Sequence, residues 1–145
     1  MDDFVGKYFH SLDSKSRLVI PAGFREKLGQ EFIIAKDFGG RMCLSLYPWE
    51  EWEKIKFQIA ARSSTAEARK KREKVYERVD ECSMDPQNRI IIKDFFKKYG
   101  KLSKNVVISG HGSKIDIWDE ETWHILHPDE EDYAAIFDDE DDITY

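Results

Sequence analysis

An internal repeat constrains the fold of this chain more than any other feature of its sequence. The segment LDSKSRLVIP at residues 12–21 returns 72 positions later as MDPQNRIIIK at residues 84–93. Further along the chain, EFIIA is matched by NVVIS and CLSLY is matched by KIDIW, in the same order. An ordered match over about fifty residues indicates two copies of one supersecondary unit.

Each copy carries the same predicted series of secondary-structure elements. A short strand and a tight turn lead into residues 18–20 or 90–92, whose β-branched and aliphatic side chains favour a strand. A short amphipathic helix follows and ends at Gly29 or Gly100, because glycine commonly closes a helix. Two further strands joined by a glycine-containing turn, and then a final helix, complete the copy.

One copy alone has too few strands to bury both faces of a sheet. We therefore predict an α+β fold, mainly β, in which two tandem repeats with short flanking helices close into one small barrel with exchanged strands. The expected boundaries are a first subdomain at 4–56, a linking basic helix at 57–77, a second subdomain at 78–127 and an acidic, disordered tail at 128–145. Ser64 and Glu67 have the spacing of a capping box at the start of the linking helix.

The charge is distributed unevenly along the 145 residues, whose formal net charge is -6. Residues 128–145 contain nine acids and no base, so residues 1–127 carry +3. Nine bases and three acids lie between Lys54 and Arg78. Such polarisation fits a body that binds a polyanion, and it also fits a solvated helix surface followed by a disordered tail.

The sequence contains no recognisable metal or cofactor site. Cys43 and Cys82 lack the paired spacing of a zinc site and are too few for a disulfide framework, so we expect reduced thiols. The four histidines form no ligand cluster. The amino terminus lacks the layout of a secretory signal, and no apolar stretch approaches the ~20 residues that cross a bilayer. We expect a soluble, cytoplasmic protein with no small-molecule substrate.

The turn before each β-branched strand carries an acid and a base. Asp13 can accept hydrogen bonds from backbone N–H groups two or three residues later and so fix its turn, and Asp85 can do the same. Arg17 then either pairs with Asp13 or reaches outward. An exposed bridge of that kind contributes ~0–1 kcal/mol. We favour an outward role for Arg17, because other bases of the first copy can surround it, namely Lys7, Lys15, Arg25 and Arg41.

These segments resemble the MraZ family of transcriptional regulators. The resemblance is carried by GKYFHSLDSKSRLVIPAGFRE, LSLYPWEEWE, ECSMDPQNRIIIKDFF and IDIWDEETW, and it extends from residue 4 to about residue 127. It implies two AbrB-like subdomains in a double-split, swapped-hairpin β-barrel, assembled into a ring-shaped homo-oligomer. It also implies a nucleoid-associated regulator, generally a repressor, that binds direct repeats of promoter DNA upstream of the division and cell-wall gene cluster.

The family's Asp-x-x-x-Arg motifs fall on Asp13 with Arg17 and on Asp85 with Arg89. The family typically has glycine where this chain has Ser16 and Asn88, and asparagine tolerates positive φ better than serine. The two substitutions are expected to strain the turns slightly or to alter their type, Ser16 more than Asn88. The turn-structuring residues are therefore expected to be Asp13, Ser16, Asp85 and Asn88.

We expect double-stranded promoter DNA to be bound by a set of cationic side chains. Lys15 and Arg17 would reach the groove, and Arg17 would read guanine with its planar fork. The others would mainly hold phosphates, more weakly in the second copy, where the lysine of the turn is absent. The full expected set is Lys7, Lys15, Arg17, Arg25, Arg41 and Arg89.

Other functions compete with this interpretation. No constellation typical of an enzyme has specific spacing. A protein-interaction module of the antitoxin type, without sequence-specific DNA binding, is the main alternative, and RNA binding has no module signature. The aromatics of the two copies are expected to be buried or to pack against another subunit rather than stack on bases; they are Tyr47, Trp49, Trp52, Trp118 and Trp123. The acidic tail is either disordered or competes with DNA for the basic face, aided by Tyr133, Ile136 and Phe137.

Overall fold

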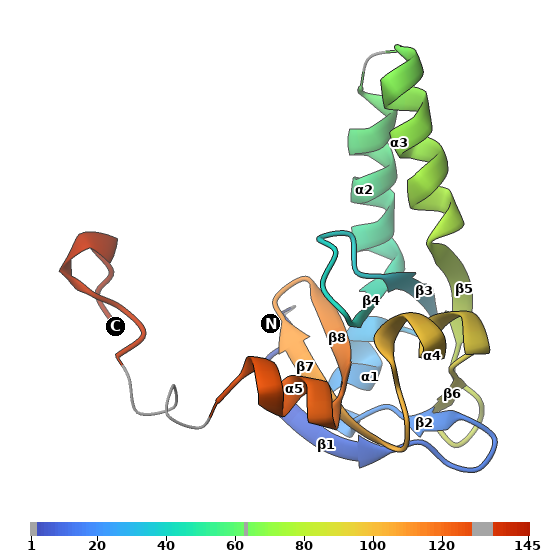
Figure 1. The fold of residues 1–145 in the computed structure, drawn as a ribbon, viewed down its shortest axis with the longest axis vertical. Helices are drawn as coiled ribbons and strands as arrows, with labels where there is room; N and C mark the ends of the chain where they lie inside the picture. The colour runs from blue at the N-terminus through green and yellow to red at the C-terminus, as the bar shows by residue number, and fades with distance from the viewer. Residues whose placement is uncertain (1–2, 63, 129–134) are drawn as a thin grey trace.

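The computed structural model describes residues 3–62, 64–128 and 135–145. The strands are β1 (Lys7–Ser11), β2 (Arg17–Val19), β3 (Glu31–Lys36), β4 (Leu44–Pro48), β5 (Val79–Ser83), β6 (Arg89–Ile91), β7 (Asn105–His111) and β8 (Lys114–Asp119). The helices are α1 (Ala22–Leu28), α2 (Trp49–Ala60), α3 (Ala66–Glu77), α4 (Asp94–Gly100), α5 (Glu120–Leu126) and the short 3₁₀ helix η2 (Asp139–Asp141). The order strand–strand–helix–strand–strand–helix occurs twice, with α3 between the two series (Figure 1).

Hydrogen bonding joins the two halves of the chain through exchanged strands. One six-stranded sheet has the order β1-β7-β8-β4-β3-β5, and β2 pairs with β6 in a separate two-stranded ribbon. Strand β1 of the first half lies against β7 of the second, and β5 of the second half lies against β3 of the first. Both orders read the same from either end once equivalent strands are exchanged, so the halves are related by a pseudo-twofold axis.

The pseudo-twofold axis passes between equivalent residues. In the six-stranded sheet, Ser45 on β4 is paired with Asp116 on β8. In the ribbon, Leu18 on β2 is paired with Ile90 on β6. Each half therefore completes the other, as expected from the shortage of strands in a single copy.

The mixed, mainly β architecture is confirmed, but the described residues do not show the closed barrel that the sequence led us to expect. The outer strands of the sheet are β1 and β5, and they do not pair with each other. Strands β2 and β6 pair with each other across the pseudo-twofold axis and do not join the six-stranded sheet.

The main core lies between the ribbon, the sheet and the short helices. Leu18 and Ile90 are fully buried on the inner side of the ribbon, and Phe24 of α1 and Phe96 of α4 are each 2% exposed. Burying an aliphatic or aromatic side chain of this size stabilises the fold by roughly 1.5–3 kcal/mol. The inner side of the ribbon is thus fixed by packing, which leaves its other side for solvent or a ligand.

Helices α2 and α3 form an antiparallel hairpin that projects from the sheet (Figure 1). Trp52 of α2 packs edge-on against Tyr76 of α3, with ring centroids 5.9 Å apart. Helix α2 continues to Ala60, through the boundary expected at residue 56. Thr65, rather than Ser64, caps α3 by accepting a hydrogen bond from the backbone N–H of Ala68 at 3.1 Å.

Glycine was expected to end both short helices, and the structure confirms this for one of them. Gly29 ends α1 with a φ of 82°, as expected for a closing glycine. Gly100 is still helical, and Lys101 takes the left-handed position after α4 with a φ of 51°. Tyr47, Trp52 and Trp118 are buried and Trp123 packs against Trp118, which confirms packing roles for these four aromatics. Trp49 is 42% exposed, so its expected burial is not observed.

Part of the tail lies outside the described residues, including Tyr133 and the rest of 129–134. Within 135–145, Asp138 caps η2 by accepting hydrogen bonds from the backbone N–H groups of Glu140 and Asp141. The expected disorder of the tail stays a prediction. In the described part of the chain, none of the helices combines the length and the apolar character that a membrane span requires.

Candidate nucleic-acid interface

Asp13 organises the turn between β1 and β2. The backbone of Asp13 exchanges hydrogen bonds with the ends of the loop, donating to Arg17 O at 3.0 Å and accepting from Ser16 N at 3.0 Å. Its Oδ1 accepts from the backbone N–H groups of Lys15 at 2.9 Å and Arg17 at 2.8 Å. This is a three-residue hairpin loop whose last residue requires positive φ.

Asp85 builds the equivalent turn with nearly identical geometry. Its Oδ1 accepts from the backbone N–H groups of Gln87 and Arg89, both at 2.9 Å. Ser16 and Asn88 both have a φ of 60°, the left-handed conformation implied by the family's glycine. Both turns are therefore kept despite the loss of glycine.

Each turn also holds its arginine side chain. Arg17 Nε lies 2.6 Å from Asp13 Oδ2, and Arg89 Nε lies 2.8 Å from Asp85 Oδ2. Hydrogen bonds from the Arg17 backbone and side chain lower the pKa of Asp13 against the opposing effect of desolvation, and Arg89 lowers the pKa of Asp85 in the same way. The arginine side chains remain 28% and 24% exposed. The acids thus orient the guanidinium groups without burying them.

The ribbon places both turns on one surface. Arg17 is paired with Ile91, and Val19 is paired with Arg89. Because side chains alternate along a strand and Leu18 and Ile90 point inward, these four residues share the outer side. Val19 is 38% exposed and Ile91 is 62% exposed. We call Arg17, Val19, Arg89 and Ile91 the ribbon face, with exposed Lys15 in the turn at its edge.

Lys97 joins this surface from the other half of the chain, which we did not expect. Its Nζ donates to Ser16 Oγ at 2.7 Å. The equivalent base in the first copy, Arg25, instead donates from Nε to Ile20 O at 2.9 Å and supports the end of the ribbon. The repeat itself aligns Arg25 with Lys97, and this was the available signal for a second cation beside the turn.

Lys7 and Arg41 do not gather around Arg17. Lys7 lies six residues before Asp13 on an extended segment, or about 20 Å at ~3.3 Å per residue. Its Nζ is 5.4 Å from the ring centroid of Trp123. Arg41 belongs to a separate ionic cluster at the pseudo-twofold axis, where its Nη2 lies 2.9 Å from Asp116 Oδ2. The expectation that Lys7 and Arg41 surround Arg17 is therefore wrong.

Asp116 is the centre of that ionic cluster. It is 2% exposed and accepts hydrogen bonds from Ser45 Oγ at 3.0 Å and Arg41 Nη2 at 2.9 Å. Lys114 Nζ lies 3.2 Å from carboxylate oxygens of both Asp116 and Asp37. The cluster satisfies its buried charges internally and links three strands and the β3–β4 loop.

A metal ion does not fit this cluster, although Asp37, Cys43 and Asp116 place possible ligand atoms within 4.8 Å of one another. Burial raises the pKa of the Cys43 thiol to about 12, so the sulfur remains protonated. Arg41 and Lys114 already neutralise the two carboxylates.

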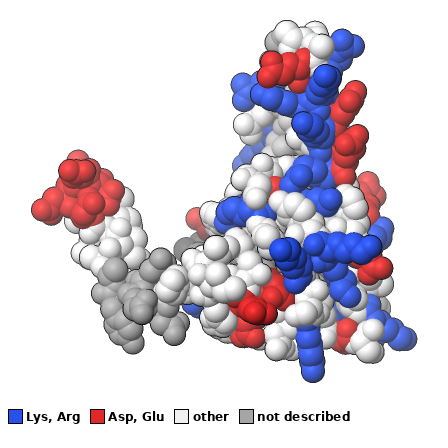
Figure 2. Space-filling view, viewed as in Figure 1, with Lys and Arg blue, Asp and Glu red and all other residues white. Residues whose placement is uncertain are grey.

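Positive charge extends beyond the ribbon face. Figure 2 shows Lys and Arg side chains gathered over the α2–α3 hairpin and over α4, with acidic side chains along one edge of the hairpin, on part of the body and on the C-terminal segment. Such a distribution would favour approach of a polyanion to the body of the protein.

Comparison with known proteins finds similarity to one family, both in a family model and in individual relatives. The family model described as "MraZ protein, putative antitoxin-like" matches residues 4–74 and 76–142. A protein of Carboxydothermus hydrogenoformans is 39% identical over 122 residues, covering 83% of this chain and 84% of the relative. A protein of Lactobacillus gasseri is 37% identical over 142 residues, covering 97% of this chain and 98% of the relative. Both relatives are named "Transcriptional regulator MraZ".

Proposed function

This chain belongs to the MraZ family, and from that premise we propose that it is a transcriptional regulator that binds promoter DNA sequence-specifically through its ribbon face. The expectation that it is not an enzyme is confirmed by membership in a family of regulators. The observation that carries the proposal is that two arginine-bearing turns, 72 residues apart in the chain, are locked side by side on one exposed ribbon.

A two-stranded ribbon is one of the elements that the major groove of DNA admits. Arg17 Nε is held by Asp13, which leaves the two terminal nitrogens of the guanidinium group to face guanine O6 and N7. Arg89 is more constrained, because its Nη2 also donates to Gln87 Oε1. Arg17 is therefore the main base reader in this proposal, and Arg89 a weaker one.

The other cations would hold the DNA backbone. Lys15 extends from the first turn and Lys97 lies beside it, so both would contact phosphates next to the groove. Lys7 and Arg25 stay in the proposed phosphate-binding set at the periphery. Arg41 is the weakest member, because Asp37 and Asp116 already neutralise it.

Assembly would supply the remaining affinity. One ribbon face offers few charges, and affinity from so small a set falls steeply with salt. A ring-shaped homo-oligomer would present the same face at regular intervals, so direct repeats in a promoter could engage several subunits at once. The proposal includes an AbrB-like exchange of hairpins between the two halves, repression of the division and cell-wall gene cluster, and a cytoplasmic, nucleoid-associated location.

The test is promoter binding by Arg17→Ala, measured against competitor DNA at several salt concentrations. Loss of a base-reading arginine should weaken specific binding by about 1–3 kcal/mol, or roughly 5–150-fold, and relax sequence preference. Lys54→Ala is a matched control, since Lys54 is 68% exposed on α2 and distant in sequence from both turns.

Two results would count against the proposal. Unchanged affinity and sequence preference in Arg17→Ala would remove the ribbon face as the reader. Failure of the wild-type protein to retain any promoter fragment, even at low salt, would favour the antitoxin-like protein-interaction alternative.

A further inference from the structure

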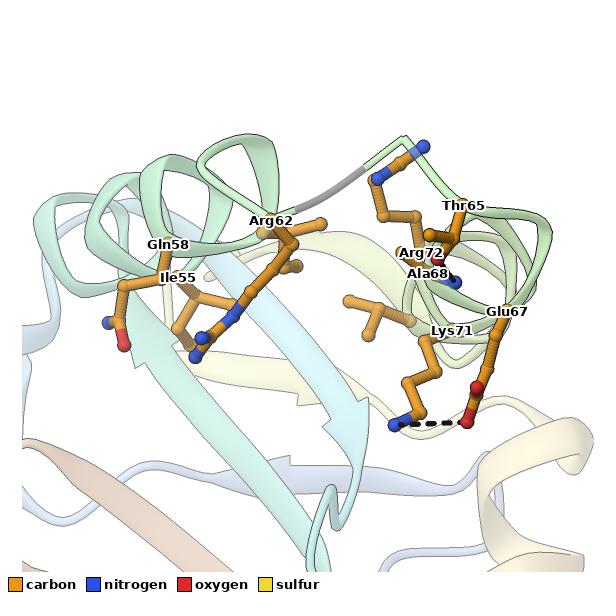
Figure 3. Close-up of a pocket in the computed structure, with 10 residues that line it drawn as sticks. Ile55, Gln58, Arg62, Thr65, Glu67, Ala68, Lys71 and Arg72 are labelled. Carbon is orange, nitrogen blue, oxygen red and sulfur yellow. Dashed lines mark hydrogen bonds and ion pairs between the residues drawn. The ribbon is translucent and has the colours of Figure 1, made fainter.

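The α2–α3 hairpin contains a groove of about 630 Å³ that its own helices do not fill. Its floor is apolar and includes Ile55, Ile59, Ala68 and Val75. Figure 3 shows Arg62, just beyond α2, running back along the α2 side beside Ile55 and Gln58, and Lys71 on the α3 side beside Glu67. The groove therefore combines an apolar floor with a cationic rim.

The helices that form the groove are poorly covered. No residue of α3 is buried, and Trp52 is the one buried residue of α2. At its base the hairpin packs on the sheet, where Trp52, Ile55 and Val75 join the cluster of Ile33, Ala35 and Tyr47. Beyond this base, one side of the apolar contact between the two helices stays open as the groove. A further segment laid along the groove would cover that side.

The charge of the hairpin indicates what kind of segment fits. Helix α2 begins with Glu50, Glu51 and Glu53, so the positive charge lies toward the tip of the hairpin, where seven bases and two acids occur between Ile55 and Val75. Two such tips would repel each other. On the rim itself, Lys71 has only a distant acidic neighbour, Glu67, at 3.9 Å, and these side chains are 77% and 83% exposed. The fitting segment is acidic and also carries apolar side chains for the floor.

Residues 135–145 of this chain have that composition. They contain five acids and no base. Ile136 is 87% exposed, Ile143 is 49% exposed and Tyr145 is 95% exposed, and the ring contact described for Phe137 is with Tyr145 of the same segment. Large apolar side chains left in solvent beside acids are the complement of an open apolar floor with a cationic rim.

We propose that the C-terminal segment 135–145 docks in the α2–α3 groove, with Ile136 and Phe137 on the apolar floor and its acids against Arg62 and Lys71. Docking cancels much of the positive charge of the hairpin and so controls its access to polyanions. The proposal concerns a surface separate from the ribbon face and does not depend on how that face reads DNA.

The docking should depend on salt. Arg62 and Lys71 are at the surface, where charge attraction is screened over about 8 Å at physiological ionic strength. The apolar contacts are not screened, so docking should weaken between low and high salt without vanishing completely.

The test uses the full-length chain with the photo-crosslinking residue p-benzoylphenylalanine at position 137, without DNA. Irradiation at low salt should attach position 137 mainly to peptides from residues 55–75, identified by mass spectrometry. Mixing isotope-labelled with unlabelled chains then tells whether the segment comes from the same copy or another, and either origin supports docking.

Charge reversal provides the control. Arg62→Glu with Lys71→Glu should reduce the crosslinks to the hairpin at least fivefold. Lys98→Glu, at an exposed position of α4, should leave them unchanged. Adding Asp139→Lys and Asp142→Lys to the first variant should restore them. Crosslinks elsewhere, no crosslinks at all, or a yield unaffected by Arg62→Glu with Lys71→Glu would overturn the proposal.

Discussion

Replacing Asp116 with alanine should remove the acceptor around which the buried ionic cluster is built. Asp116 accepts hydrogen bonds from Arg41 Nη2 at 2.9 Å and Ser45 Oγ at 3.0 Å. It also lies 2.8 Å from His111 Nδ1 and 3.2 Å from Lys114 Nζ. The substitution leaves Arg41 and Lys114 with Asp37 as their shared carboxylate partner.

The expected cost follows from the burial of the cluster. Removing one partner of a buried ion pair destabilises a protein by about 3–5 kcal/mol, because the remaining charge is left uncompensated. Lys114 is 15% exposed and keeps Asp37 at 3.2 Å, which places the loss near the lower end of this range. At about 2–4 °C per kcal/mol for a chain near this size, Tm should fall by roughly 6–12 °C.

Urea unfolding followed by tryptophan fluorescence measures this loss, since Trp118 is 3% exposed in the fold. Glu51→Ala is the matched control, because its pair with Lys54 is at the surface and is worth ~0–1 kcal/mol. Adding Lys114→Met to Asp116→Ala should recover part of the stability, because it removes one of the two cations that then share Asp37. A loss below about 1 kcal/mol in Asp116→Ala would refute the reasoning about buried charge.

The same cluster predicts a pH dependence. Burial alone would raise the pKa of Asp116, but the hydrogen bond from His111 and the charges of Lys114 and Arg41 outweigh it and lower the pKa below the ordinary value of 3.8. The ionised carboxylate therefore stabilises the fold above that pH, and the stabilisation is lost as pH falls through the lowered pKa. Stability of Asp116→Ala should be flatter than that of the wild type in this acidic range.

Three further substitutions test local features of the fold by urea midpoint. Lys101→Gly should stabilise the protein by about 0.5–1 kcal/mol, because glycine adopts the φ of 51° after α4 without the penalty of a side chain; a destabilised variant would contradict this. Gly110→Ala should destabilise it by about 1–3 kcal/mol, since the added Cβ would lie 2.5 Å from the backbone of Phe4; a neutral effect would show that this contact is loose. Thr65→Ala should cost about 1 kcal/mol through loss of the cap of α3, and equal loss in Ser64→Ala would shift the cap back to Ser64.

The elements that the sequence predicted well are those set by local chemistry. The strands expected at 18–20 and 90–92 occur at Arg17–Val19 and Arg89–Ile91, one residue earlier. The positive φ of Ser16 and Asn88 followed from the glycine of the resembling family. In each case the determining contacts lie within a few residues, so the pattern alone carries the information.

The contacts between the two halves could not be predicted from the sequence. Arg41 reaches Asp116 75 residues away, and Lys97 reaches Ser16 81 residues away. Both contacts exist because strands are exchanged between the halves, and the order of exchange decides which charges meet. A repeat shows that two units associate, but it does not give the register that sets their neighbours.

The covalent link between the halves has a consequence for any duplex lying on the ribbon. A pair of identical subunits would look the same from either direction and could not tell one DNA strand from its complement. Here Lys15 occupies the first turn, and Gln87 occupies the equivalent position in the second turn. Gln87 Oε1 accepts a hydrogen bond from the terminal nitrogen Nη2 of Arg89. Because the two turns belong to one chain and differ in sequence, the two ends of the ribbon are not equivalent, and a duplex lying on it would meet a different side chain at each end.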